Sequence, residues 1–194
     1  MKYREMAGEK ISVLGFGCMR FPTTSKNAED IDAEKSAKML EYAIENGVNY
    51  FDTAYVYHGG KSESFIGGVL KPYRDKIHIA TKCPTWEVKC EEDFDRLLNE
   101  QLERLQTDYI DFYLMHALDK DRFKNVVEKF NLIDKLNKAK ADGKIRHIGF
   151  SFHDDVETLK KIIDANPNWE FCQIQLNYIN VKYQAGLEGL EYAH

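Results

Sequence analysis

Short apolar runs that end in a polar side chain recur along the chain. Four of them cover residues 48–53, 77–82, 110–116 and 145–151, and they carry Asp52, Lys82, His116 and Ser151 at or near their ends. Side chains on a strand alternate between its two faces, so each polar residue shares a face with the residue two positions before it. The pattern predicts four strands whose polar ends lie together.

The segments between these runs have the periodicity of amphipathic helices. Apolar residues recur at steps of three and four, most clearly in residues 91–105, and Asp32 and Gly47 stand where a helix would begin and end. We predict helices over residues 32–47, 62–70, 91–105, 123–141 and 156–167. A further strand is predicted over residues 171–178, with Gln173 in it, and the final GLEGLEYAH indicates another helical segment.

The N-terminus predicts a β-hairpin. Residues 2–6 and 11–15 flank a Gly-Glu-Lys turn, and the second arm is expected to continue into LGFGCMR. Gly15 and Gly17 suggest a dinucleotide-binding fingerprint, but Arg20 occupies the position of its third glycine and no helical pattern begins there.

Six alternations of strand and helix predict parallel βαβ units with right-handed crossovers. Polar groups at the carboxyl ends of strands favour a barrel over an open sheet. A complete (β/α)₈ barrel takes about 250 residues, so residues 1–194 are expected to form a single domain that is a partial TIM-type barrel of about six strands, preceded by the hairpin. Its first and sixth strands would have open edges, which predicts possible self-association.

Composition narrows the classes of function. The chain has a net charge of −5, a pI near 5.7, and lysines spread over acidic helices, which argues against nucleic-acid and membrane partners. No apolar run approaches the ~20 residues of a membrane span, and MKYREMAGEK lacks the apolar core of a secretion signal. We therefore expect a cytoplasmic protein, in which the four cysteines are free thiols because they show no paired spacing.

The polar residues at the predicted strand ends suit carbonyl reduction. Tyr57 follows the first of these strands, and a nearby cation such as Lys82 favours the phenolate form of a tyrosine. Asp52 is the candidate carboxylate that holds this lysine. His116 is a candidate hydrogen-bond donor to a carbonyl oxygen, while Tyr57 protonates the developing alkoxide.

From about residue 11 onward the chain resembles the aldo-keto reductases. The segments that carry the resemblance follow in order: LGFGCMR, FDTAYVYHGGKSESFIG, IATK, DYIDFYLMH, GKIRHIGFS and QIQLNY. The chain looks like the N-terminal six βα units of the family's barrel. GFSFHD is similar to a bacterial branch whose longer members add an iron-sulfur domain, and Phe152 and His153 stand where many members carry Asn.

The resemblance implies a function and a set of site residues. The function is hydride transfer from NAD(P)H, with NADP(H) favoured over NAD(H), to an aldehyde or ketone without a metal. Asp52, Tyr57, Lys82 and His116 would be the catalytic tetrad. The resemblance further implies that the nicotinamide carboxamide binds Ser151 and Gln173, with Asn177 a weaker candidate on the same strand. The candidates for the substrate pocket are Met19, Arg20 and Trp86.

Other interpretations remain open at this point. Each polar residue alone could be structural: Asp52 as a cap, Tyr57 as a packed aromatic and Lys82 as a solvated cation. The chain could instead be a non-catalytic barrel that binds a nucleotide or a protein, or a truncated barrel that is inactive without a partner. A metal-dependent barrel hydrolase is a further alternative, but His58, His147 and His153 show no ligand spacing.

Overall fold

Six parallel strands form the main sheet of the computed structural model, which describes residues 1–194. Each strand pairs with the next in chain order, and the two end strands, β3 and β8, each have one unpaired edge. The strand bounds are β3 Phe16–Gly17, β4 Tyr50–Asp52, β5 His78–Cys83, β6 Ile110–Leu118, β7 Ile145–Phe152 and β8 Phe171–Ile174. The sheet curls into a partial barrel, as the alternation of strands and helices predicts.

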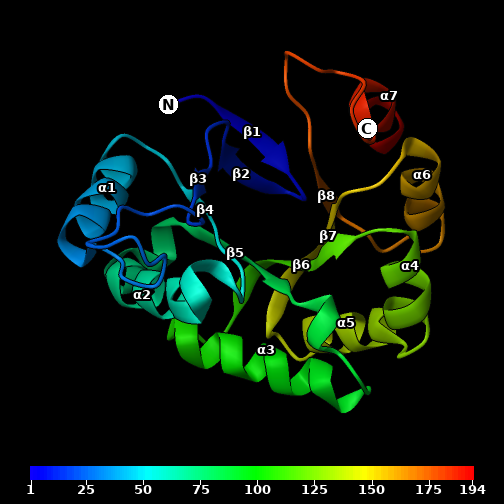
Figure 1. The fold of residues 1–194 in the computed structure, drawn as a ribbon, viewed down its shortest axis with the longest axis horizontal. Coiled ribbons are helices and arrows are strands. Elements are labelled where there is room, and N and C mark those ends of the chain that lie inside the picture. The colour runs from blue at the N-terminus through cyan, green and yellow to red at the C-terminus, as the bar shows by residue number, and fades with distance from the viewer.

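Helices cover the outer side of the curled sheet, and Figure 1 shows them following one another along an arc from α1 through α3 to α6. The Asp32 side chain accepts a hydrogen bond from the backbone of Lys35, so it is the predicted N-cap of the first helix. The longer helices are α1 Ala33–Glu45, α2 Lys61–Leu70, α3 Glu92–Leu105, α5 Leu132–Ala141, α6 Val156–Asp164 and α7 Gly186–Ala193. Short helical turns are η1 Tyr57–Gly60, η2 Lys71–Lys76 and η3 Thr85–Glu87.

Apolar side chains pack on both faces of the sheet. The larger core lies between the sheet and the helices, and a smaller one lies on the inner face. The inner core contains Ala80, Phe112 and Leu114, with Tyr50 packed against it. Tyr50, Ala80 and Leu114 each stand two positions before a polar strand-end residue, so the predicted alternation of faces is confirmed.

The N-terminal hairpin forms, but its turn and its second arm differ from the prediction. Strand β1 (Tyr3–Met6) pairs with β2 (Glu9–Ser12) through a two-residue turn in which Ala7 and Gly8 both have positive φ. Such a turn matches the twist of hairpin strands, and the second arm begins at Glu9, two residues earlier than predicted. The second arm ends at Ser12 because its backbone N–H and hydroxyl bind Asn49, which directs the chain away towards β3.

Two further predictions about element bounds are wrong. The helix predicted over residues 123–141 is divided into the π-helical turn η4 (Phe123–Glu128) and α5, with Asn131 in a left-handed conformation at the start of α5. The short helix α4 (Lys120–Arg122) precedes η4. Asparagine tolerates this conformation better than most residues. The strand predicted over residues 171–178 ends at Ile174, because its partner β7 ends at the paired residue Phe152.

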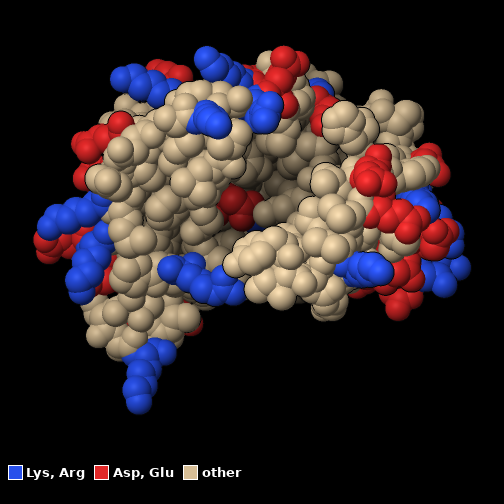
Figure 2. Space-filling model, turned by 90° about the horizontal axis from the view of Figure 1, so that it is seen from above, with Lys and Arg blue, Asp and Glu red and all other residues tan.

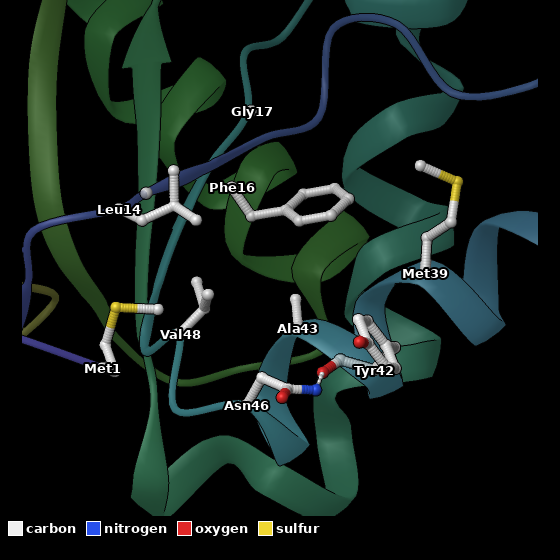
Figure 3. Close-up of a pocket in the computed structure, with 10 residues that line it drawn as sticks. Met1, Leu14, Phe16, Gly17, Met39, Tyr42, Ala43, Asn46 and Val48 are labelled. Atoms are coloured by element: carbon white, nitrogen blue, oxygen red, sulfur yellow. Dashed lines mark hydrogen bonds between the residues drawn. The ribbon is translucent and has the colours of Figure 1, made fainter.

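An apolar pocket of about 390 Å³ lies beside the open edge of the sheet at β3. Figure 3 shows Leu14 and Phe16 on one side of it and Met39 and Tyr42, from α1, on the other. The exposed fractions of Leu14 and Tyr42 are 59% and 69%. Self-association through the open strand edges stays a prediction.

None of the helices is long and apolar enough to span a membrane. Figure 2, the view from above, shows a hollow at the centre of the molecule with mostly uncharged walls. Basic and acidic side chains alternate around the margins of this face, so the face carries no extended basic patch.

A buried polar network ties α2, α3 and two strands together on the outer face of the sheet. The Gln101 amide donates to Glu63 at 2.6 Å, to Thr81 at 3.2 Å and to the backbone carbonyl of Lys82 at 3.1 Å. Its oxygen accepts a hydrogen bond of 2.7 Å from Tyr113. Every polar group of the Gln101 side chain is therefore satisfied, although the side chain is fully buried.

We expect Gln101→Leu to lower the free energy of unfolding by about 2 to 4 kcal/mol, because it leaves the buried Glu63 and Tyr113 short of partners. Urea denaturation measures the change. The control is Glu103→Leu on the exposed face of α3, where a surface substitution is expected to change the stability by less than about 0.5 kcal/mol. Equal stabilities for the two variants would contradict the role of the network.

Candidate active site

The predicted site residues lie at the carboxyl ends of successive parallel strands. Asp52 ends β4. Lys82, His116 and Ser151 each lie one or two residues before the carboxyl end of β5, β6 and β7. Gln173 in β8 pairs directly with Ser151. Because neighbouring parallel strands end at the same edge of a sheet, these side chains converge on one mouth of the barrel.

A cavity of about 780 Å³ opens at this mouth. Eight of the ten residues predicted for the site line it: Met19, Arg20, Tyr57, Lys82, Trp86, His116, Ser151 and Gln173. The volume lies in the range of small-molecule and cofactor sites. Asp52 lies behind Lys82, and Asn177 lies outside the lining.

The ammonium group of Lys82 is the most buried charge of the cavity, with 2% of the residue exposed. Its Nζ lies 2.8 Å from Asp52 Oδ1 and 2.7 Å from the carbonyl oxygen of Thr53. Burial raises the pKa of Asp52, and the charge of Lys82 opposes that shift. The two acceptors hold Lys82 in one place, as the sequence predicts for a lysine in a dry pocket.

The phenol of Tyr57 faces this ammonium group. Its hydroxyl oxygen lies 3.4 Å from Lys82 Nζ, which itself lies 4.9 Å from the centre of the phenol ring. Tyr57 begins the turn η1, and its backbone N–H donates to the carbonyl of Ala54. The turn therefore brings the tyrosine from the loop back over the end of β5.

His116 forms the opposite wall of the cavity. Its ring stands edge-on to Tyr57, with ring centres 6.2 Å apart, and 5.0 Å from the ring of Trp86. Burial, followed by the positive charge of Lys82, lowers the pKa of His116 to about 3. His116 is therefore a neutral imidazole near pH 7, and its buried Nδ1 has no protein partner.

An irregularity in β6 shapes the wall beside His116. Ala117 has a φ of 53°, which is unusual for alanine, and the pairing of β6 with β7 shifts between Met115 and Leu118. The N–H of Ala117 donates a hydrogen bond of 2.7 Å to Ser151 Oγ. Since that oxygen accepts from the backbone, the Ser151 hydroxyl proton is free to point into the cavity.

Gln173 and Asn177 have different surroundings. The side chain of Gln173 lines the cavity and makes no hydrogen bond to another protein group. The side-chain oxygen of Asn177 accepts from the backbone N–H groups of Ile179 and Asn180, in a loop beyond β8. The structure brings Gln173 to Ser151 but does not bring Asn177 to the cavity.

Two lining histidines were not assigned to the site from sequence. His58 and His153 line the cavity. The sequence analysis names both as lacking metal-ligand spacing, and His153 also as standing where many family members carry Asn. His153 follows Ser151 by two positions, so the alternation of side chains along β7 indicates that both lie on the same face. His58 carries no such signal, because it lies in a turn whose backbone conformation the sequence does not reveal.

Known proteins are similar to this chain in sequence and fold. The model of the Aldo/keto reductase family matches residues 13–193. A probable aldo-keto reductase from Glycine max is 32% identical over 153 residues, which are 74% of this chain and 42% of that protein. The chain thus spans about half the length of such relatives.

Two solved structures are similar to the chain. An aldo-keto reductase from Bacillus halodurans, in its holo form, has a TM-score of 0.72 and 28% identity, with 90% of this chain and 57% of that chain covered. An aldo/keto reductase from Klebsiella pneumoniae, in complex with NADP and acetate, has a TM-score of 0.68 and 25% identity, with coverage of 87% and 55%. Because the model of the aldo/keto reductase family matches almost the whole sequence, the chain belongs to this family.

Proposed function

We propose that this domain carries the catalytic groups of an NAD(P)H-dependent reductase of aldehydes or ketones, with Tyr57 as the general acid. One observation carries the proposal: the Lys82 ammonium group lies between Asp52 and Tyr57 in a cavity whose opposite wall is the neutral His116. A cation, a phenol and an uncharged hydrogen-bond donor around one space suit the protonation of a carbonyl oxygen.

The residues at the β7 and β8 side of the cavity fit the carboxamide of a nicotinamide. The Ser151 hydroxyl is free to donate, and the Gln173 amide has both a donor and an acceptor without protein partners. A bound nicotinamide supplies the hydride from its C4 position. The lining contains no carboxylate that would repel an anionic cofactor.

The roles of the protein groups follow from their positions. His116 donates a hydrogen bond to the substrate carbonyl and orients it. The Tyr57 hydroxyl then gives its proton to that oxygen as the carbonyl carbon is reduced, and Lys82 stabilises the phenolate that remains. Asp52 keeps Lys82 at the tyrosine. Met19, Arg20 and Trp86 form the wall available to the rest of a small-molecule substrate.

The Klebsiella pneumoniae relative is a complex with NADP, which supports the proposal that NADP(H) is preferred over NAD(H). The predicted cytoplasmic location also stays a proposal. Since the chain spans about half the length of its relatives, the activity is proposed for the whole protein that contains this domain. Nucleotide binding without turnover by that protein would instead favour a nucleotide-binding module.

We expect the imidazole of His116 to show no titration between pH 5 and pH 8, because burial and Lys82 lower its pKa to about 3. The unfolded chain takes up this proton near pH 6.5, so the stability contributed by neutral His116 is full above pH 6.5 and declines as the pH falls towards 3. NMR titration of the ring signals, assigned with His116→Gln, measures the effect. A midpoint between pH 5 and pH 8 would contradict the neutral donor.

We expect Tyr57→Phe to lower kcat by about 10² to 10⁴ with little change in NADPH affinity, because only the transferable proton is lost. Steady-state turnover of an aldehyde with NADPH measures the effect. The control is Tyr55→Phe, since the Tyr55 hydroxyl binds Glu100 outside the cavity. Full turnover in the Tyr57 variant would exclude Tyr57 as the general acid.

We expect Ser151→Ala to weaken NADPH binding about fivefold to thirtyfold, the loss that corresponds to one hydrogen bond of about 1 to 2 kcal/mol. Quenching of protein fluorescence by NADPH gives the dissociation constant. The control is Ser64→Ala on the exposed face of α2, which should leave the constant unchanged. Equal affinity in both variants would remove Ser151 from the cofactor site.

A further inference from the structure

His58 directly follows Tyr57 and has a strained backbone. Its φ of 53° and ψ of 43° are left-handed, and only 6% of the residue is exposed. A left-handed conformation is unfavourable for most residues other than glycine. Such a conformation persists where the surrounding contacts hold the residue in place.

Both nitrogens of the His58 ring make hydrogen bonds to backbone groups of a distant segment. Nε2 lies 3.0 Å from the N–H of Phe21, and Nδ1 lies 2.5 Å from the carbonyl oxygen of Ala28. An N–H group only donates and a carbonyl oxygen only accepts, so the proton must lie on Nδ1. The geometry therefore defines a neutral ring in a single tautomer.

The segment after Phe21 forms backbone hydrogen bonds within itself. The backbone of Thr24 binds Asp30, and that of Asp32 binds Pro22, which closes residues 22–32 into a loop of their own. An ion pair of 3.4 Å between Glu29 and Lys61 adds a second link, but both side chains are about half exposed. Exposed ion pairs contribute little, so the buried hydrogen bonds between this segment and η1 are those of the His58 ring. The Glu29 side chain also lies against Gly59 of η1.

Packing supports the same link. The Phe21 ring lies 5.6 Å from the His58 ring and 5.2 Å from Phe65 of α2, centre to centre. Immediately before Phe21, Met19 and Arg20 line the cavity, and Ala28 lines it from the other end of the loop. The ring of His58 thus binds the wall at Phe21, next to Met19 and Arg20, and again at Ala28.

We propose that His58 is a positioning residue that couples the wall containing Met19 and Arg20 to the turn that carries Tyr57. The kinetic part of the inference rests on the proposed reductase function, whereas the coupling itself does not. A carbonyl substrate large enough to reach the wall depends on this coupling for its alignment with Tyr57. A small substrate that contacts only the tetrad does not.

Three variants separate the two hydrogen bonds. His58→Asn keeps a donor near the position of Nδ1 and loses the bond to Phe21, while His58→Gln keeps an acceptor near the position of Nε2 and loses the bond to Ala28. His58→Phe keeps an aromatic ring against Phe21 and loses both bonds. Asparagine also tolerates the left-handed backbone, so at least one variant should fold without added strain.

Hydrogen exchange tests the coupling without any cofactor. We expect the Phe21 amide to exchange about tenfold faster in the Asn and Phe variants, as for a lost bond of about 1.4 kcal/mol, and to stay protected in the Gln variant. The matched control is His147→Phe, which removes a histidine bond to Glu170 at the start of β7 and should leave the Phe21 amide unchanged. Nitrogen NMR of the wild-type protein should show that Nε2 of His58 carries no proton.

Kinetics test the consequence in the whole protein. We expect KM for naphthaldehyde to rise about fivefold or more in His58→Phe, as for a lost contact of about 1 kcal/mol. The kcat and KM for methylglyoxal should change less than about twofold. A purely structural role would lower the melting temperature and affect both substrates alike, which would overturn the inference.

Two results would also overturn the coupling directly: equal exchange of the Phe21 amide in all variants, or a proton on Nε2 of His58. If the exchange rates change as expected while the wild type reduces no carbonyl, the coupling is supported and the proposed reductase function fails. The two parts of the inference are therefore tested separately.

Discussion

A buried ammonium group at the end of β5 sets the main constraint on this structure. Lys82 is 2% exposed, and a cation removed from water is strongly destabilising unless it is paired and hydrogen-bonded. Its partners are Asp52, the last residue of β4, and the carbonyl of Thr53, the next residue in the chain. The pairing register of β4 and β5 is therefore coupled to charge neutralisation, because a shift of one residue would move Lys82 to the other face of the sheet.

The same strand is held from its outer face. Gln101 donates to the carbonyl of Lys82 and also to Glu63 and Thr81, which connects the backbone beneath the ammonium group to α2 and α3. One side of β5 thus orients the charge, and the other side fixes the chain that carries it. Breaking a buried pair of this kind by removing one partner typically costs about 3 to 5 kcal/mol, so chemistry and stability are coupled at this point.

The sequence predicts the strand-end residues well because their positions depend on local rules. The two-residue period of a strand places Asp52, Lys82 and Ser151 on the inner side as soon as the apolar runs are recognised. The break at Asn131 was missed because the apolar period of the helix continues across it, and the break depends on one left-handed residue. The early end of β8 at Ile174 does not follow from the sequence of the strand, because β8 ends where its partner β7 ends. The position of that partner is a property of the tertiary structure.

The site divides into parts that differ in how far the sequence and the fold determine them. Asp52, Lys82 and His116 lie on consecutive central strands, whose neighbours on both sides hold them in register. Gln173 lies on β8, a four-residue strand paired on one side only and partly exposed. Segments with few buried contacts open locally at lower free energy. The groups proposed for proton transfer therefore belong to the rigid part of the sheet, whereas the proposed carboxamide contact of Gln173 depends on the least supported strand.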